Sequence, residues 1–131
     1  MRRILLAFII CYPTLCLPQK ANTTSRYEIV SKSKNRDGMV SHLNVFIGKA
    51  ADIKQANTEL VKLYKKPGLK YLQILYYDNK TVAKTYERKL FDKGTTDSQI
   101  DRMSQHVIGK FEYLATNNSE SLHIGKEADT Y

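Results

Sequence analysis

The chain has 131 residues and carries 21 lysines and arginines against 13 aspartates and glutamates, a formal net charge of +8. Hydrophobic residues make up 42% of the sequence and charged residues 26%, which predicts a packed core and excludes a chain that is disordered by composition. The length suits a single domain, and the basic balance favours anionic partners such as lipid headgroups, acidic polysaccharide or nucleic acid.

Residues 1–17 have the order of a secretory signal peptide. Two arginines precede an apolar run from Ile4 to Cys11. Pro13 interrupts this run before it reaches the roughly 20 residues that a membrane-spanning helix needs. The alternative is a first strand or helix buried in the domain. We expect export, to the periplasm or as a secreted protein.

Cys16 offers a second outcome for the same segment. Bacterial lipoproteins carry a lipid on a cysteine that directly follows the apolar segment, so Cys16 is a candidate for lipidation and for anchoring to a bacterial membrane. Leu15 differs from the small residue that normally precedes such a cysteine, which favours a freely secreted or periplasmic domain. We expect contact with a membrane only through this lipid.

The residues that follow, 18–25, are polar and lack hydrophobic periodicity, which predicts a tether. A single domain is expected over 26–125. It begins with two alternating runs, RYEIVSKSK and VSHLNVFI, separated by a turn at residues 35–38. Leu43, Val45 and Ile47 share one face of the second run. These runs predict a β-hairpin.

Helical spacing of apolar residues predicts a helix over 49–65, which Pro67 and Gly68 end. The run Tyr71–Tyr77 is rich in residues that favour strands and predicts a central strand. Asn79 is then a candidate cap for a second helix that ends before Gly94. Its apolar face consists of Val82, Ala83, Tyr86 and Leu90.

Thr96 and Gln99 have the spacing of a capping box, which predicts a helical turn over 98–105. A second hairpin follows. Its first strand places three apolar residues on one face and its second strand pairs two across from them: Val107, Phe111 and Tyr113 against Leu122 and Ile124. The polar residues 126–131 predict a frayed tail.

The expected element order is β-β-α-β-α-β-β. It predicts an α+β fold with a mostly antiparallel sheet of about five strands and with helices on one face. The segments YYDNKTVAKTY and VIGKFEYLATNNSESLHI resemble small, uncharacterised exported proteins and lipoproteins of bacteria. This resemblance implies export but supplies no activity and no catalytic residues.

Basic residues interleaved with tyrosines between residues 62 and 93 form the most suggestive feature of the sequence. Cations and aromatic rings on one surface would suit a glycan or single-stranded nucleic acid, although core tyrosines beside a solvated basic face explain the same pattern. Export disfavours nucleic acid. The candidate patch for an anionic ligand consists of Lys62, Lys66, Lys80, Lys84, Arg88 and Lys89.

Three histidines, His42, His106 and His123, lie on three different predicted strands and could meet on the open sheet face. Metal ligands must converge in this way, but solvent-facing histidines explain the pattern more simply. Seven carboxylates are candidates for acid-base chemistry, but solvated surface charges explain them better: Glu59, Asp78, Glu87, Asp92, Asp97, Asp101 and Glu112. No nucleophile motif or glycine-rich phosphate loop occurs, so no catalytic residue, metal or cofactor is expected.

These observations favour a non-enzymatic binding or interaction module of the cell envelope or extracellular space. An envelope component, a glycan or a protein is the expected class of partner. The alternative is a small secreted hydrolase whose site assembles only in the fold. If no cleft brings His42, His106 or His123 within hydrogen-bond reach of a carboxylate, this alternative loses its best candidates.

Overall fold

The computed structural model describes residues 26–129 of the chain. The export signal expected over 1–17, with Cys16, and the tether over 18–25 lie outside the described residues. No helix within residues 26–129 is both long and apolar enough to cross a membrane.

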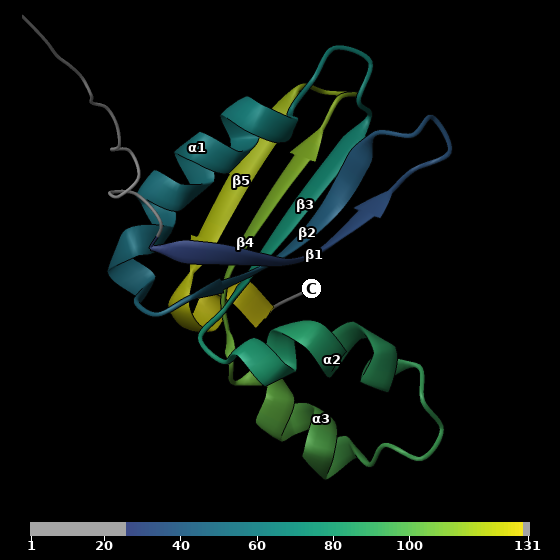
Figure 1. Ribbon diagram of the computed structural model, residues 1–131, viewed down its shortest axis with the longest axis vertical. Helices are drawn as coiled ribbons and strands as arrows, with labels where there is room; N and C mark the ends of the chain where they lie inside the picture. The colour runs from purple at the N-terminus through teal and green to yellow at the C-terminus, as the bar shows by residue number, and fades with distance from the viewer. Residues whose placement is uncertain (1–25, 130–131) are drawn as a thin grey trace, which may run out of the picture.

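The described residues form one five-stranded sheet with three α-helices (Figure 1). In chain order, the elements are β1 (Tyr27–Lys34), β2 (Val40–Ile47), the 3-10 turn η2 (Ala50–Asp52), α1 (Ile53–Tyr64), β3 (Tyr71–Tyr77), α2 (Lys80–Leu90), α3 (Asp97–Ser104), β4 (Val107–Leu114), β5 (Ser119–Ile124) and the 3-10 helix η3 (Gly125–Asp129). The strands lie in the order β1-β2-β3-β4-β5.

All neighbouring strands are antiparallel except β2 and β3. Helix α1 connects these two strands and brings the chain back to the end of the sheet where β2 begins, so β3 runs parallel to β2. The predicted α+β class and the mostly antiparallel sheet are therefore confirmed.

One face of the sheet is covered by α1. Alternate residues of β2, β3 and β4 point toward this helix and form the main core. Its strand members are Leu43, Val45, Ile47, Leu72, Ile74, Tyr76, Phe111 and Tyr113, and its α1 members are Ile53, Ala56 and Leu60. The predicted inward face of β2 is thus confirmed.

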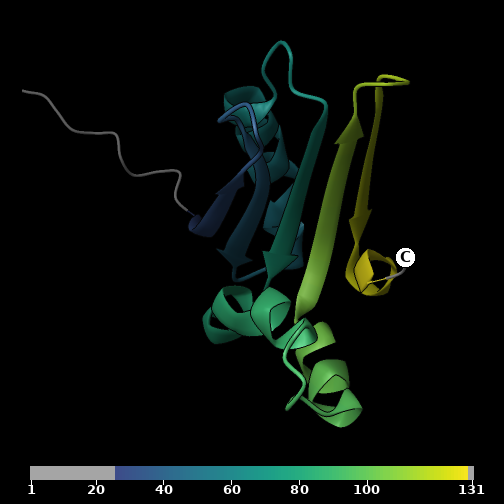
Figure 2. The same cartoon turned by 90° about the vertical axis from the view of Figure 1, so that its right-hand side faces the viewer.

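Helices α2 and α3 lie at the lower end of the sheet, away from α1 (Figure 2). They pack on the opposite phase of β3, where Leu75 and Tyr77 join Val82, Ala83 and Tyr86 in a second buried cluster. Helix α1 therefore covers one face, as predicted, whereas α2 and α3 pack on the other face. Strand β3 is apolar on both phases near its end, so both faces there need cover.

The strand β4 carries a register shift that the sequence pattern did not reveal. Tyr76 pairs with Gly109, whereas Tyr77 pairs with Val107, so one extra residue of β4 is accommodated between them. Val107 consequently packs with Tyr77 in the second cluster, while Phe111 and Tyr113 face α1. The prediction that Val107 shares a face with Phe111 and Tyr113 is wrong because of this bulge.

The folded part of the chain extends beyond residue 125. Residues 125–129 form η3, and its Ala128 is 1% exposed. The frayed tail expected from residue 126 is therefore wrong for residues 126–129. A small apolar side chain within a polar segment is enough to pack this turn against β4, in the same cluster as Val107.

Candidate functional site

The structure divides the predicted basic patch between two ends of the molecule. Lys62 lies near the end of α1 and Lys66 just after it, whereas the other four cations belong to α2. Strand β3 runs between these two places (Figure 1). Seven residues of strand span about 23 Å. The six residues therefore do not form one contiguous surface.

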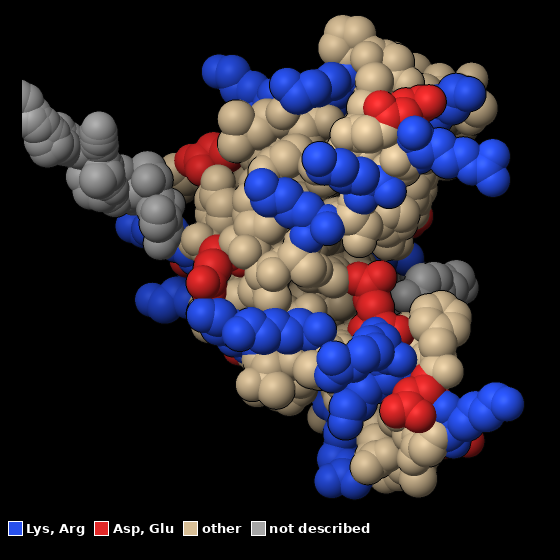
Figure 3. All heavy atoms as spheres, turned by 45° about the vertical axis from the view of Figure 1, so that its right-hand side comes forward, with Lys and Arg blue, Asp and Glu red and all other residues tan. Residues whose placement is uncertain are grey.

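Three of the four α2 cations lie along a single face of the helix. Lys80, Lys84 and Arg88 are spaced four residues apart and are exposed. The buried side of the helix consists of Val82, Ala83 and Tyr86. We call the row Lys80, Lys84 and Arg88 the α2 basic face. In Figure 3, lysines and arginines lie over the α2–α3 end, at the bottom of the view, with acidic residues among them, and others lie over the upper part.

Lys89 does not belong to this face. It is half-buried and lines a hollow of about 220 Å³ with Gln99, Arg102 and Met103. The hollow lies between α2 and α3. Lys89 therefore faces α3 and takes no part in the α2 basic face.

The charges of the α2 basic face are only partly neutralised. The Nζ atom of Lys80 lies 2.8 Å from Oε2 of Glu28 on β1. Within residues 26–129, Lys84 and Arg88 form no ion pair and no side-chain hydrogen bond. The nearby Glu87 is instead turned toward the sheet, where its Oε1 accepts a hydrogen bond from Nδ2 of Asn44. Two exposed cations thus remain available to an external anion.

Phe91 lies at the end of the same row. It caps the C-terminus of α2, and its side chain is 87% exposed. It follows Arg88 by three residues, which places it on the α2 basic face. Its neighbour Leu90, predicted to belong to the apolar face of α2, is 37% exposed. Phe91 was not predicted as a site residue, although its spacing from Arg88 is visible in the sequence.

A histidine and a carboxylate meet where β3 ends and β4 begins. Nδ1 of His106 lies 2.7 Å from Oδ1 of Asp78, and the Asp78 amide donates to the His106 carbonyl at 3.0 Å. Both side chains are substantially exposed. A carboxylate at Nδ1 orients an imidazole, as in catalytic pairs, and leaves Nε2 for another partner. Ser104 is the nearest hydroxyl in sequence, and its Oγ donates to the Asp101 carbonyl at 2.9 Å.

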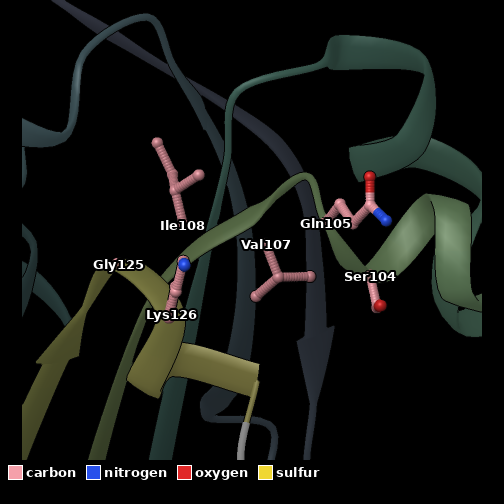
Figure 4. A pocket seen from close by; sticks show the side chains of 6 residues that line it. All are labelled: Ser104, Gln105, Val107, Ile108, Gly125 and Lys126. Atoms are coloured by element: carbon pink, nitrogen blue, oxygen red, sulfur yellow. The ribbon is translucent and has the colours of Figure 1, made fainter.

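A pocket of about 420 Å³ lies beside this pair (Figure 4). Its walls come from the end of α3, the start of β4 and the start of η3. They are formed by Ser104, Gln105, Val107, Ile108, Gly125 and Lys126. Val107 and Ile108 point to opposite sides of the strand in this view. Neither His106 nor Asp78 lines the pocket, so the pair and the pocket do not combine into one site.

The other two histidines do not meet. His42 is on β2 and His123 on β5, with β3 and β4 between them, which separates them by about 14 Å. In the part of the chain that the structure describes, no three histidine, cysteine, aspartate or glutamate side chains could hold a metal ion.

The candidate carboxylates form no hydrogen-bonded pair with one another among residues 26–129. Asp78 contacts His106, and Glu87 contacts Asn44. Glu112 accepts a hydrogen bond from the Tyr71 hydroxyl at 3.1 Å. Each of these three carboxylates therefore has a partner that holds a strand or helix in place.

The chain was also compared with known proteins. No protein-family model, no curated protein and no solved structure matches it. The function therefore has to be inferred from the geometry of the α2 basic face and of the His106–Asp78 pair.

Proposed function

We propose that this protein is a non-enzymatic binding module that acts outside the cytoplasm and uses the α2 basic face to bind an anionic partner. One observation carries the proposal. Lys84 and Arg88 are exposed on the same side of one helix and have no ion-pair partner among residues 26–129. An anion that approaches this side meets two free cations, with Lys80 beside them.

Helix stability accounts for only part of this row, namely for Arg88, which lies in the last turn, where the helix dipole favours a cation. Like charges four residues apart destabilise a helix by about 0.2–0.5 kcal/mol per pair. Lys80 occupies the first turn of α2, where the helix dipole disfavours a cation and where no acidic residue lies. Recognition of negative charge is a better explanation, because it requires several cations on one accessible side.

The place of action rests on the N-terminal sequence. The two arginines followed by the run Ile4 to Cys11 support export, with lipidation at Cys16 as the alternative to a free protein. Mass spectrometry of the intact protein from its host tests this part. Removal of the signal is the expected result. A mass that retains the whole N-terminus would contradict export by cleavage, and added acyl mass on Cys16 would identify a lipoprotein.

The binding surface is tested by reversing its charge at matched positions. The variant Lys84→Glu/Arg88→Glu should bind the polyanion heparin, immobilised on a column, at least about tenfold more weakly. Each cation near an anionic surface contributes about 1 kcal/mol to the free energy of binding. The control is Lys62→Glu/Lys66→Glu, which makes the same change of charge in two exposed residues near the end of α1. Equal weakening in both variants would mean that net charge alone drives binding and would refute the proposed surface.

A small secreted hydrolase is the second candidate, and the His106–Asp78 contact of 2.7 Å favours it. A carboxylate that orients a histidine is a common part of hydrolytic sites. If the protein hydrolyses an ester or a glycoside, His106→Ala should abolish that activity and Asp78→Asn should reduce it. An activity that is unchanged in His106→Ala would exclude this pair as its source.

A further inference from the structure

We infer that the α2 basic face docks on the surface of an anionic lipid bilayer and that Phe91 enters the boundary between the headgroups and the acyl chains. This inference rests on the proposed function, since it names the partner of the same surface. It differs from the sequence-based expectation, in which a lipid on Cys16 is the only membrane contact.

Phe91 is the first observation that points to an apolar environment. Its side chain is 87% exposed, the largest exposure of any large hydrophobic residue in the described part of the chain. An aromatic ring with this much exposed surface gains free energy when it moves from water into an apolar environment. Its sequence neighbour Leu90 is 37% exposed.

The alignment of Phe91 with the cations is the second observation. Counted from Lys80, the next members of the face follow at four, eight and eleven residues, namely Lys84, Arg88 and Phe91. At 3.6 residues per turn, these positions fall within a narrow strip of the helix surface. A planar surface can therefore contact the three cations and the ring together.

A bilayer offers both of the environments that this strip requires. Its phosphates pair with lysine and arginine, while the boundary beneath them accepts an apolar ring. A soluble polyanion that carries no apolar groups satisfies the cations but leaves the exposed ring of Phe91 in water. The observed combination of charge and apolar surface therefore favours the bilayer.

The position of Phe91 suits contact with a flat surface. The segment that follows α2 projects from the lower end of the molecule, away from the sheet (Figure 1). Lys93 in this segment is exposed and adds a cation beyond Phe91. The one carboxylate next to Phe91 belongs to Asp92, and its Oδ1 accepts a hydrogen bond from the Gly94 amide at 2.9 Å. One oxygen of this carboxylate is therefore occupied by a hydrogen bond within the loop.

The absence of tryptophan from the sequence allows a direct test. The variant Phe91→Trp places a single fluorescent reporter at the proposed point of insertion. The variant is purified from its host and mixed with vesicles of equal parts phosphatidylglycerol and phosphatidylcholine, or with vesicles of phosphatidylcholine alone. We expect a blue shift of the emission with the anionic vesicles only. The matched control is Leu63→Trp, at a position 56% exposed on α1, which should show no shift.

The charge requirement is tested in the same background. Adding Lys84→Glu/Arg88→Glu to Phe91→Trp should raise the anionic lipid concentration at half-maximal shift by at least tenfold. A reporter whose emission does not shift with anionic vesicles, or shifts equally with neutral ones, would overturn the inference. If heparin binding still depends on Lys84 and Arg88 in that case, the proposed function stands and its partner is a soluble polyanion or an acidic protein. If neither ligand depends on them, the proposed function fails as well.

Discussion

The hydroxyl group of Tyr76 on β3 donates a hydrogen bond to Oδ1 of Asn57 on α1, with a distance of 2.8 Å between the two oxygens. Both residues are buried, and Tyr76 has no exposed surface. Each polar group satisfies the other inside an apolar core, so the pair fixes the position of α1 along the sheet. The main core between α1 and the sheet depends in part on this contact.

The substitution Tyr76→Phe should destabilise the protein by about 1–3 kcal/mol, because it leaves the buried oxygen of Asn57 without its donor. Urea denaturation followed by circular dichroism measures the change. The double variant Tyr76→Phe/Asn57→Leu removes both partners and should recover part of the loss. An unfolding midpoint equal to that of the wild type in Tyr76→Phe would contradict a structural role for this hydrogen bond.

Stability should also decrease in alkali. Burial, and to a smaller extent Tyr27, raises the pKa of Tyr76 above its ordinary value of 10.0. In the unfolded chain this tyrosine ionises near pH 10, so the unfolded state binds fewer protons than the folded state above that pH. Its contribution to stability is complete below pH 10 and decreases as the pH rises beyond it, by up to about 1.4 kcal/mol per pH unit.

The free energy of unfolding of wild type and Tyr76→Phe, measured across this range, tests that sign. The wild type should lose stability more steeply than the variant above pH 10. Parallel curves would show that Tyr76 does not titrate on unfolding. Burial and the carboxylate of Glu59 also raise the pKa of Tyr27, so a smaller slope of the same sign is expected to remain in the variant.

Gly109 lies where β4 approaches α1 closely. A Cβ atom at this position would lie 2.8 Å from Cδ1 of Ile53 and 3.2 Å from the ring of Tyr76. The substitution Gly109→Ala should therefore destabilise the protein by about 1–3 kcal/mol through overpacking. Thermal unfolding of a double-mutant cycle with Ile53→Val measures the coupling. Valine lacks the Cδ1 methyl group nearest to the added Cβ, so Ile53→Val should destabilise Gly109→Ala less than it destabilises the wild type. Strictly additive changes in stability would mean that the strain does not arise between these two residues.

Asn79 begins α2 and thereby sets the start of the α2 basic face. Its side-chain oxygen accepts a hydrogen bond from the Val82 amide at 3.0 Å. Asn79→Ala should lower the free energy of unfolding by about 0.5–2 kcal/mol, whereas Asn79→Asp should keep the cap and stay close to the wild type. Chemical denaturation of both variants measures this, and an equal loss in the two would mean that the cap does not act through this oxygen.

The local elements could be predicted because their signals are confined to short stretches. The Asn79 cap is present, and Thr96 and Gln99 form both hydrogen bonds of a capping box. The β-hairpins follow from alternation and the turn residues between the strands. Two features depend on contacts between distant segments, namely the bulge that turns Val107 away from Phe111 and the packing of α2 on the second face. The hydrophobic periodicity of a single segment predicts neither the bulge nor the packing of α2.

The candidate site was predictable only in part for the same reason. All six cations of the predicted patch could be identified from the sequence pattern. Their separation to two ends of the molecule follows from the length and direction of β3. The pairing of His106 with Asp78 joins the ends of two strands that are 28 residues apart in sequence, and no spacing rule relates them. Phe91 was missed because a single aromatic residue at a helix end resembles a core residue until its exposure is known.

The single substitution Lys84→Glu separates binding from folding. It replaces the unfavourable contacts of residue 84 with Lys80 and Arg88 by two attractive ones, each four residues apart, while the new repulsion with Glu87 offsets part of the gain. The free energy of unfolding should therefore stay unchanged or increase by up to about 0.5 kcal/mol. Binding to anionic vesicles and to heparin should weaken in the same protein. Urea denaturation measures the first quantity, and a clear loss of stability would mean that Lys84 has a structural partner. Equal or higher stability together with weaker binding would assign this lysine to recognition, because the fold does not need its charge.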